Sequence, residues 1–285
     1  MIERAWAFSG KELMGLTRYL ICFIIGLLFF TTGCTTVKEY SGRSQPQKIR
    51  KSANRSIPRQ QRSGLAVLSF ANTTAHEQAD YFQPWEYGIA AMLTTDLEQT
   101  AMFNIIDRER LNDILTEQDL QRSGLVDQRT AVTLGKLTAA NYILTGVFMV
   151  VGEDLKITAQ VFSVEKGIQL GAISVSGKTE DFFLVEKDLF INVTKTLKIV
   201  LDDEKQAEII RTIETRSIEA SLRNYSGEIA MMRAEEMKKL GREEDTMILE
   251  NDAKQKFREA LEYDPKYERA RKNLARLVMA IPMTL

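Results

Sequence analysis

The sequence predicts an α/β domain, built as a small mixed sheet with flanking helices, followed by an α-helical tail. Three observations lead to this prediction. Short apolar runs alternate with amphipathic stretches between residues 64 and 200. Apolar and polar residues alternate with a period of two over residues 155–161, as in a strand with one wetter face. Residues 217–285 are instead rich in Ala, Glu, Lys, Arg and Leu, a composition typical of helices.

The expected elements of the first domain follow one another along residues 64–200. An apolar run predicts a strand over 64–70, followed by a polar loop over 71–83. The spacing of apolar residues predicts helices over 85–100, after Asp107, after Asp127 and over 182–197. Further strands are expected over 102–106, 142–151, 155–161 and about 168–176. The predicted order is therefore β-α-β-α-α-β-β-β-α.

Composition favours a binding or assembly protein over an enzyme. The chain has 285 residues, which allows one large domain or two small ones with a tail. Two Cys and one His are too few for a Cys/His zinc site or a disulfide scaffold, and most catalytic triads would depend on His76 alone. Lys and Arg number 38 against 39 Asp and Glu, so nucleic acid is not expected as a partner. We expect no enzymatic activity, no catalytic residues, no metal and no cofactor.

The N-terminus has the features of an export signal. Residues 19–30 are uncharged and apolar, too short to span a bilayer but long enough for the core of a signal peptide. A start at Met14, just before Arg18, would give a signal peptide of ordinary length. The small residues before Cys34 are similar to a bacterial lipobox, which implies a lipid on this Cys. We expect a signal peptide over 1–33 and lipid attachment at Cys34; an uncleaved anchor is the alternative.

The next segment, residues 34–63, is a basic linker. It holds eight Lys and Arg residues against Glu39, a net charge of +7, whereas residues 64–285 carry −9. One interpretation is adhesion of the linker to anionic lipid headgroups or cell-wall polymer. The other is a solvated spacer between the membrane and an acidic body.

Several blocks of the α/β domain together resemble one family. They are AVLSFAN over 66–72, FNIIDRERL over 103–111, ILTEQ over 114–118, SGLVD over 123–127 and AANYILTG over 139–146. Their order and spacing are similar to those of CsgG, the curli secretion family, which includes holdfast-anchoring relatives. The same fold resembles flagellar outer-membrane lipoproteins and lipoprotein activators of cell-wall synthases. The resemblance covers residues 64–200.

The resemblance implies a lipid-anchored domain at the periplasmic face of the bacterial outer membrane, serving envelope assembly or export. Envelope proteins would be its partners, and a homo-oligomer stays open. A secretion channel of the curli type is an alternative function, and activation of a cell-wall synthase is another. A channel needs long segments inserted into this domain, about 20 residues or more for each membrane-spanning hairpin. The connections at 152–154 and 165–167 are far shorter. We therefore expect binding and scaffolding rather than conduction.

The tail, residues 217–285, resembles a tetratricopeptide repeat and is preceded by a connecting helix over 201–216. In a 34-residue frame that starts at Ala234, the matching positions are Leu240, Gly241, Ala253, Phe257, Ala260 and Pro265. Met237 and Glu244 depart from the bulky residues that this repeat usually has. A generic helical hairpin is the alternative. One and a half repeats cannot bury a core alone, so the hairpin should pack on the α/β domain, on a second copy or on a partner.

Three smaller patterns complete the set of candidates. Tyr81, Phe82, Trp85 and Tyr87 cluster at the start of the first helix, either as a partner-binding surface or as cover for the core edge. Five residues separate Gly171 from Gly177, whereas a phosphate-binding loop needs four. His76 lies near Glu77 and Asp80 but in no metal-binding pattern. We expect neither nucleotide nor metal at these places.

Overall fold

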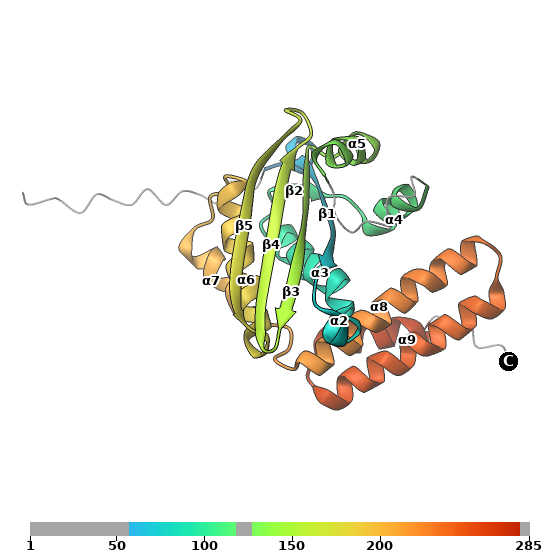
Figure 1. The fold of residues 1–285 in the computed structure, drawn as a ribbon. Coiled ribbons are helices and arrows are strands. Elements are labelled where there is room, and N and C mark those ends of the chain that lie inside the picture. Colours follow the sequence, from blue (N-terminus) through green and yellow to red (C-terminus); the bar gives the residue numbers. More distant parts are fainter. Residues whose placement is uncertain (1–56, 118–126, 280–285) are drawn as a thin grey trace, which may run out of the picture. The chain divides into compact units, whose positions relative to one another are not determined.

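The computed structural model describes residues 57–117 and 127–279 (Figure 1). The chain divides into two units, residues 1–51 and 52–285, and every described residue belongs to the second. The expected signal peptide, Cys34 and most of the basic linker lie outside the described residues.

A five-stranded mixed sheet forms the centre of the first domain. Its strands lie in the order β2-β1-β3-β4-β5. They are β1 (Ser63–Asn72), β2 (Phe103–Ile105), β3 (Tyr142–Val151), β4 (Asp154–Ser163) and β5 (Ile168–Lys178). β1 runs parallel to both β2 and β3, while β3, β4 and β5 form an antiparallel meander. The predicted fold class is confirmed.

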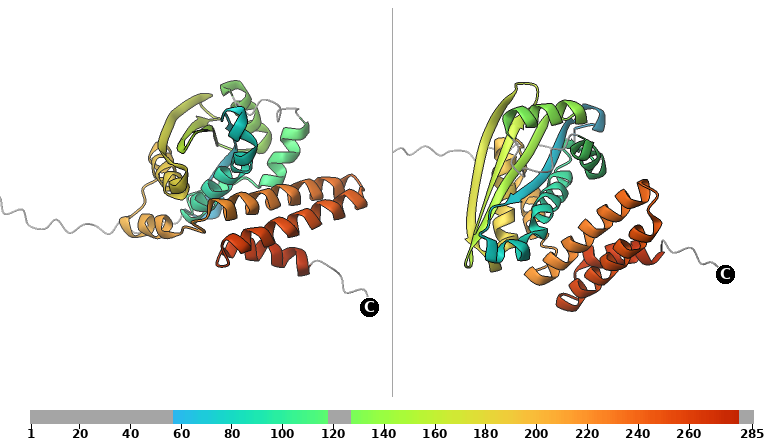
Figure 2. Two further views of the ribbon diagram at one scale, coloured as in Figure 1. Left: turned by 60° about the horizontal axis from the view of Figure 1, so that its bottom comes forward. Right: turned by 45° about the vertical axis from the view of Figure 1, so that its right-hand side comes forward.

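Helices cover both faces of the sheet, which explains the nearly continuous apolar sequence of β1. On one face α3 (Pro84–Gln99) and α6 (Phe182–Thr196) enclose the main core. On the other, α4 (Arg108–Glu117) and α5 (Gln128–Thr138) cover a smaller cluster of Ala66, Leu68, Ile143 and Phe162. Figure 2 shows these two layers from other sides.

The helix starts follow the capping residues of the sequence. Pro84 is the first residue of α3, where its missing N–H costs no hydrogen bond. The backbone N–H groups of Thr130 and Arg110 donate to Asp127 at 2.8 Å and to Asp107 at 3.3 Å. The polar loop expected over 71–83 is wrong in part, because α2 (His76–Phe82) forms there. Its last residue, Phe82, packs against Trp85 with ring centroids 4.8 Å apart, and this tertiary contact supports the short helix.

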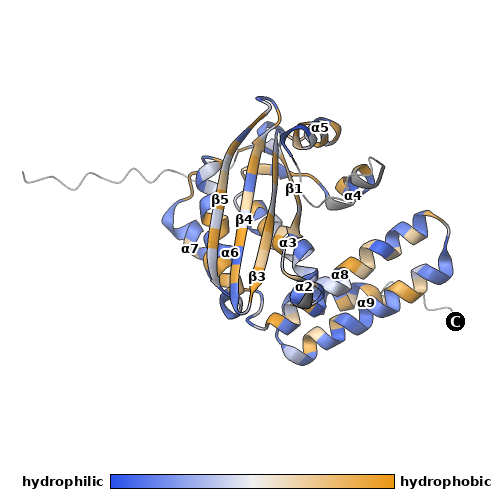
Figure 3. Cartoon of the chain, in the orientation of Figure 1, coloured by the Kyte–Doolittle hydropathy of each residue, from blue (hydrophilic) through white to orange (hydrophobic). Residues whose placement is uncertain are grey.

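Four helices follow the sheet. They are α7 (Asp203–Arg211), α8 (Ile218–Lys239), α9 (Glu243–Tyr263) and α10 (Glu268–Met279). α7 is shorter than the connecting helix expected over 201–216, and residues 212–217 are not helical. In α8 and α9 hydrophilic and hydrophobic residues alternate along the helices (Figure 3). Among the helices of the described segments, none combines the length and the hydropathy needed to cross a membrane.

The repeat frame that starts at Ala234 does not fit the tail. It requires Leu240 and Gly241 inside a first helix, but they end α8. Gly241 has a φ of +70°. The N–H of Arg242 donates to the carbonyl of Met237, and the N–H of Gly241 donates to that of Lys238. This pair of bonds is a Schellman motif, in which Gly accepts a left-handed backbone that other residues resist. The Leu-Gly pair is therefore a helix stop.

Candidate partner-binding site at the junction of sheet and tail

The helical tail joins the sheet domain through α3. A Cβ on Gly88 of α3 would lie 2.5 Å from the ring of Tyr225 in α8, so only Gly permits this approach. The indole N–H of Trp85 donates to the hydroxyl of Ser221 at 3.3 Å. The ring of Trp85 also stacks on Phe182 of α6, with centroids 3.8 Å apart. The junction is thus continuous with the main core.

This arrangement decides between the two interpretations of the aromatic cluster. Trp85 has no exposed surface, and Phe82 is 6% exposed, so both belong to the core. Tyr87 is half-buried, and its ring centroid lies 6.2 Å from that of Tyr225. Only Tyr81 of the four presents most of its side chain to solvent. The four residues do not form one exposed partner surface.

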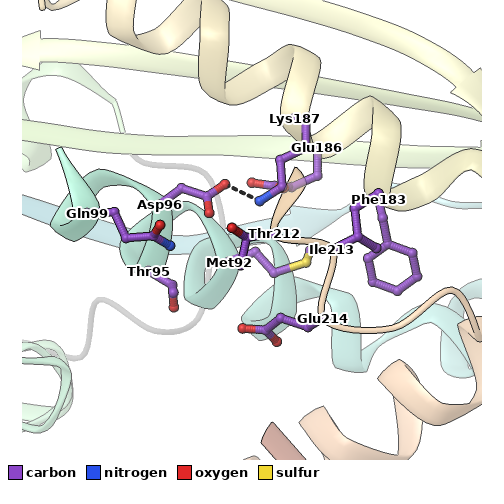
Figure 4. Close-up of a pocket in the computed structure, with 10 residues that line it drawn as sticks. All are labelled: Met92, Thr95, Asp96, Gln99, Phe183, Glu186, Lys187, Thr212, Ile213 and Glu214. Carbon is purple, nitrogen blue, oxygen red and sulfur yellow. Dashed lines mark hydrogen bonds and ion pairs between the residues drawn. The ribbon is translucent and has the colours of Figure 1, made fainter. Parts of the chain in front are cut away.

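A buried ionic cluster lies between α3, α6 and residues 212–214 (Figure 4). The amino group of Lys187 lies 2.5 Å from a carboxylate oxygen of Asp96 and 3.5 Å from one of Glu186. Burial raises the pKa of Glu186 to about 8, and nearby Asp96 adds to the rise. Burial likewise raises the pKa of Asp96 to about 6, against the attraction of Lys187. At neutral pH Glu186 therefore holds a proton, and Lys187 and Asp96 remain as the ion pair.

The space beside this cluster is too small for a substrate. Its volume is about 20 Å³, enough for roughly one water molecule, whereas ligand pockets span about 300–1,000 Å³. One carboxyl oxygen each of Glu186 and Glu214 is buried without a hydrogen-bond partner there. No group of three potential metal ligands occurs in the part of the chain that the structure describes. The arrangement therefore suits a structural role better than catalysis.

A second buried ionic cluster attaches α10. The guanidinium of Arg269 contacts both carboxylate oxygens of Glu228 in α8, at 2.6 and 3.1 Å. It also reaches Glu214 at 3.4 Å and Thr95 of α3 at 3.5 Å, and it lies 5.5 Å from the ring centre of Tyr225. Burial opposes the charge of Glu228, but Arg269 outweighs it and lowers the pKa of this carboxyl. Because Glu214 faces both clusters, they form one polar network from α6 to α10.

A groove of about 480 Å³ lies along the same junction, within the size range of ligand pockets. One wall is β1 over Leu68–Ala71, which lies beyond the residues Ser63–Leu65 that pair with β2. The start of α3 and Asn112 of α4 add to that side. The facing wall comes from the α8–α9 hairpin, with Ile229, Met232, Arg233, Leu249 and Asp252. Of the pockets described, this groove best fits a segment of a partner.

The remaining tail candidates lie inside the hairpin or at its end. Ala253, Phe257 and Ala260 are buried. The ring of Phe257 covers Gly227 of α8, where a Cβ would lie 2.6 Å from it. Pro265 lies in the connection between α9 and α10. Leu240 is 64% exposed and, with Met247 and Ile248, gives the end of the hairpin an apolar surface.

The remaining candidates from the sequence do not form a binding site among the residues that the structure describes. Gly171 and Gly177 lie within β5, so they form no phosphate-binding loop. His76 begins α2, and its side chain lies outside what the structure describes, as does Cys34. Sequence reasoning missed the network of Asp96, Lys187, Glu214, Glu228 and Arg269. Gly88 and Gly227 signalled only the close packing of Tyr225 on α3 and of Phe257 on α8, because an isolated Gly inside a helix often marks such a contact, and they did not signal the charges.

Residues 47–187 match the family described as curli production assembly/transport component CsgG. No curated protein matches the chain. Among solved structures, the chain is similar to the C-terminal domain of LpoB from Salmonella enterica, with 15% identity over 41% of this chain and 83% of that one, at a TM-score of 0.30. The chain is also similar to lipoprotein GNA1162 from Neisseria meningitidis, with 11% identity over 47% of this chain and 99% of that one, at a TM-score of 0.33.

A third similar structure is a PelC dodecamer from Paraburkholderia phytofirmans, with 15% identity over 48% of this chain and 89% of that one, at a TM-score of 0.29. At TM-scores near 0.3, these likenesses transfer neither function nor assembly to this chain.

Proposed function

Because the chain belongs to the CsgG family over residues 47–187, we propose that it is a bacterial envelope lipoprotein that assists the assembly or export of a surface structure. The surface structure would be of the curli, holdfast or flagellum type. The protein would act by binding other envelope proteins, without catalysis and without a cofactor beyond the lipid on Cys34. The family match carries this proposal, and the groove at the junction supplies a place for a partner.

The chemistry of the described residues supports binding over catalysis. The carboxyls with the largest upward pKa shifts, Glu186 and Asp96, surround a space for about one water. The larger groove has a mixed lining, with apolar Ile229 and Leu249 beside charged Arg233 and Asp252. Such a lining suits a protein segment that presents both apolar and polar side chains.

We place the protein at the periplasmic face of the outer membrane, held by the lipid on Cys34. Thr35 follows this Cys, whereas in enterobacteria an Asp there favours retention in the inner membrane. The test is fatty-acid labelling and membrane fractionation of the wild type, Cys34→Ala and Cys22→Ala. Only Cys34→Ala should lose the label and accumulate as a larger precursor. Unchanged labelling, mass and fractionation in that variant would contradict the anchor.

The groove is tested with two neighbouring residues of α9. Leu249 lines the groove, whereas Ile248 is 58% exposed outside it. We expect Leu249→Lys to reduce capture of envelope proteins by the membrane-bound chain and to impair the surface structure, while Ile248→Lys preserves both. Circular dichroism and thermal unfolding verify that both variants fold. Equal behaviour of the two folded variants would remove the groove from the proposal.

A secretion channel is the second candidate, because the description of the matched family includes transport. Planar bilayer recordings of the purified chain distinguish the two functions. An accessory protein gives no discrete conductance steps. Stable and reproducible single-channel openings would favour the channel.

A further inference from the structure

Three segments meet at the end of the sheet where β1 begins, at the top of Figure 1. They are residues 57–64 with the short helix η1 (Arg59–Gln61), residues 127–141 with α5, and residues 164–170 with the β4–β5 turn. The side-chain amide of Asn104 in β2 donates to the carbonyl of Arg59 at 2.8 Å, and the amide of Gln128 in α5 donates to the carbonyl of Gly167 in the turn. We call this surface, made of residues 57–64, 127–141 and 164–170, the linker end.

The linker end is basic, although the folded chain as a whole is acidic. Its three segments hold five Lys and Arg residues against two acids, a net charge of +3, whereas residues 64–285 carry −9. At the opposite end of the sheet, α2 with residues 152–154 and 178–181 holds six acids against one Lys, a net charge of −5. This asymmetry along the strands orients the folded chain near a charged surface. The five bases are Arg59, Arg62, Arg129, Lys136 and Lys166, of which all but the half-buried Arg62 are exposed.

Large apolar side chains are exposed beside these bases. Leu137 follows Lys136 in α5 and is 44% exposed. Ile168 and Leu170 come just after Lys166 and are 46% and 36% exposed. Apolar side chains interleaved with Lys and Arg are typical of surfaces that lie at an anionic bilayer, where the apolar groups enter the headgroup region and the bases attract the phosphates. A hydrophilic cell-wall polymer would engage the bases but leave the apolar side chains in water.

The basic linker joins the folded chain at this same end. The described chain begins at Ile57, two residues before η1, and residues 34–63 carry a net charge of +7. Cys34 and Ile57 are 23 positions apart, which is about 80 Å of fully extended chain. The linker alone therefore does not hold the fold against a membrane, but it delivers the linker end, rather than the acidic end, to the bilayer.

We propose that the linker end is a docking surface for the anionic headgroups of the membrane that holds the lipid on Cys34. Arg129, Lys136 and Lys166 contact the lipid phosphates, and Leu137 enters the headgroup region. The acidic end points away from the membrane, because the same anionic surface repels it. The lipid tethers the chain, and the linker end orients it.

This orientation rests on the proposed lipid anchor and adds a consequence for the partner groove. The groove is lined by the start of α3, over Gln83–Tyr87, which directly follows α2 at the acidic end. It is also lined by Leu68–Ala71 in the second half of β1, away from the linker end. Docking of the linker end therefore leaves the groove accessible to other envelope proteins.

The test follows both ends of the sheet in the full-length lipidated chain, reconstituted in vesicles that carry a quencher on their headgroups. A fluorophore is attached at Thr133→Cys, an exposed position of α5, or at Ser176→Cys, an exposed position near the acidic end. The vesicles contain phosphatidylcholine alone or with phosphatidylglycerol. We expect quenching only of the label at position 133, only with phosphatidylglycerol, and its loss at high salt, because salt screens the attraction.

Two double variants then assign the docking to named bases. Lys136→Gln with Lys166→Gln should lower the ratio of docked to undocked chains, obtained from the quenched fraction, at least about tenfold. Lys238→Gln with Lys266→Gln removes the same charge from exposed positions of the tail and should preserve the ratio. Circular dichroism verifies that both variants fold, and the comparison of the two vesicle types needs neither of them.

Equal quenching at position 133 in both vesicle types, or equal docking of the two double variants, would overturn the proposal. Binding to purified cell-wall sacculi through the same two bases, without a response to phosphatidylglycerol, would overturn it as well and assign the surface to the cell wall. A chain that does not float with phosphatidylcholine vesicles contradicts the lipid anchor instead. Flotation with phosphatidylglycerol vesicles then still decides the docking, because the linker end binds them without the anchor.

Discussion

The sheet domain and the helical tail are held together by different forces. The core between the sheet, α3 and α6 is filled with large apolar side chains, among them Trp85, Phe70, Phe148 and Phe190. The tail buries many small residues, such as Ala220, Ala253 and Ala270, around a few large ones, chiefly Phe257 and Tyr267. It is attached by the packing of Leu222 and Tyr225 into the main core and, in addition, by the ionic network around Arg269. Changes in pH and charge should therefore affect the attachment of the tail more than the sheet core.

The largest loss of stability is expected when the side chain of Phe257 is removed. This residue is 1% exposed and fills the space between α8 and α9, where Leu277 and Leu274 of α10 pack in the same cluster, so Phe257→Ala leaves a cavity at the centre of the tail. We expect unfolding free energy to fall by about 3–5 kcal/mol, with loss of helical circular dichroism from the tail. The control is Met247→Ala on the same helix, which is 60% exposed and should change stability by about 0.5 kcal/mol or less. Unchanged stability in Phe257→Ala would show that the helices are packed differently.

Removal of Arg269 should have the next largest effect. Arg269→Met leaves Glu228 buried with no cationic partner, which typically costs about 3 kcal/mol or more. Removing both charges, in Arg269→Met with Glu228→Leu, should recover part of the loss, because the buried carboxylate of Glu228 is no longer left without a cation, while Glu214 still loses its contact with Arg269. Chemical denaturation of the four members of this mutant cycle measures the coupling. Additive losses would mean that the two side chains do not act as a pair.

The pH dependence of stability distinguishes the two regions further. Between its ordinary pKa of 4.5 and about 8, Glu186 keeps a proton in the folded chain that the unfolded chain releases. The folded state then binds more protons, so stability falls as pH rises through this window. Asp96, with a pKa of about 6, adds to the fall at its acidic end. Glu228 has the opposite effect. Its pKa is lowered in the folded chain, so its ion pair stabilises the fold at neutral pH, and this stability is lost only as the pH falls below the ordinary pKa of 4.5.

Glu186→Gln should therefore flatten the stability profile between about pH 5 and 8, since the amide cannot ionise. The exposed Glu180 supplies the matched control, and Glu180→Gln should preserve the slope of the wild type. Urea unfolding at several pH values gives both profiles. A slope in Glu186→Gln equal to that of the wild type would assign the pH dependence to other groups.

The smallest expected effect comes from an exposed ion pair at the contact of α4 with α8. Lys239 lies 3.1 Å from Asp113, and both side chains are largely exposed. Asp113→Asn should change stability by about 0–1 kcal/mol, because solvent screens the pair. A larger loss in denaturant unfolding would show that this contact, rather than the buried network, determines the stability of the tail.

Sequence patterns predicted the sheet domain better than the tail, for a physical reason. Strand periodicity, Pro84 and the caps Asp107 and Asp127 act over a few residues, so they can be interpreted locally. The fit of Trp85 against Phe182 depends on residues far apart in the chain, and an aromatic cluster at a helix start does not show whether it is buried.

The candidate site at the junction was the least predictable part. Arg269 contacts Thr95, a residue 174 positions earlier, and Lys187 contacts Asp96, 91 positions earlier. In the sequence these side chains resemble the ordinary charges of solvent-exposed helix faces. The Leu240-Gly241 pair was assigned to a repeat. A Gly that comes shortly after two Lys residues, here Lys238 and Lys239, is equally typical of a helix C-terminus. Only the packed structure distinguishes these alternatives.

Hydrogen exchange of the full chain with and without Arg269→Met tests the central claim most directly. If the buried network attaches the tail, the substitution should lower protection in α8 and α10 by roughly tenfold or more, whereas β3 and β4 should keep theirs. A uniform loss of protection across the strands and the tail, or no loss in α8 and α10, would contradict it.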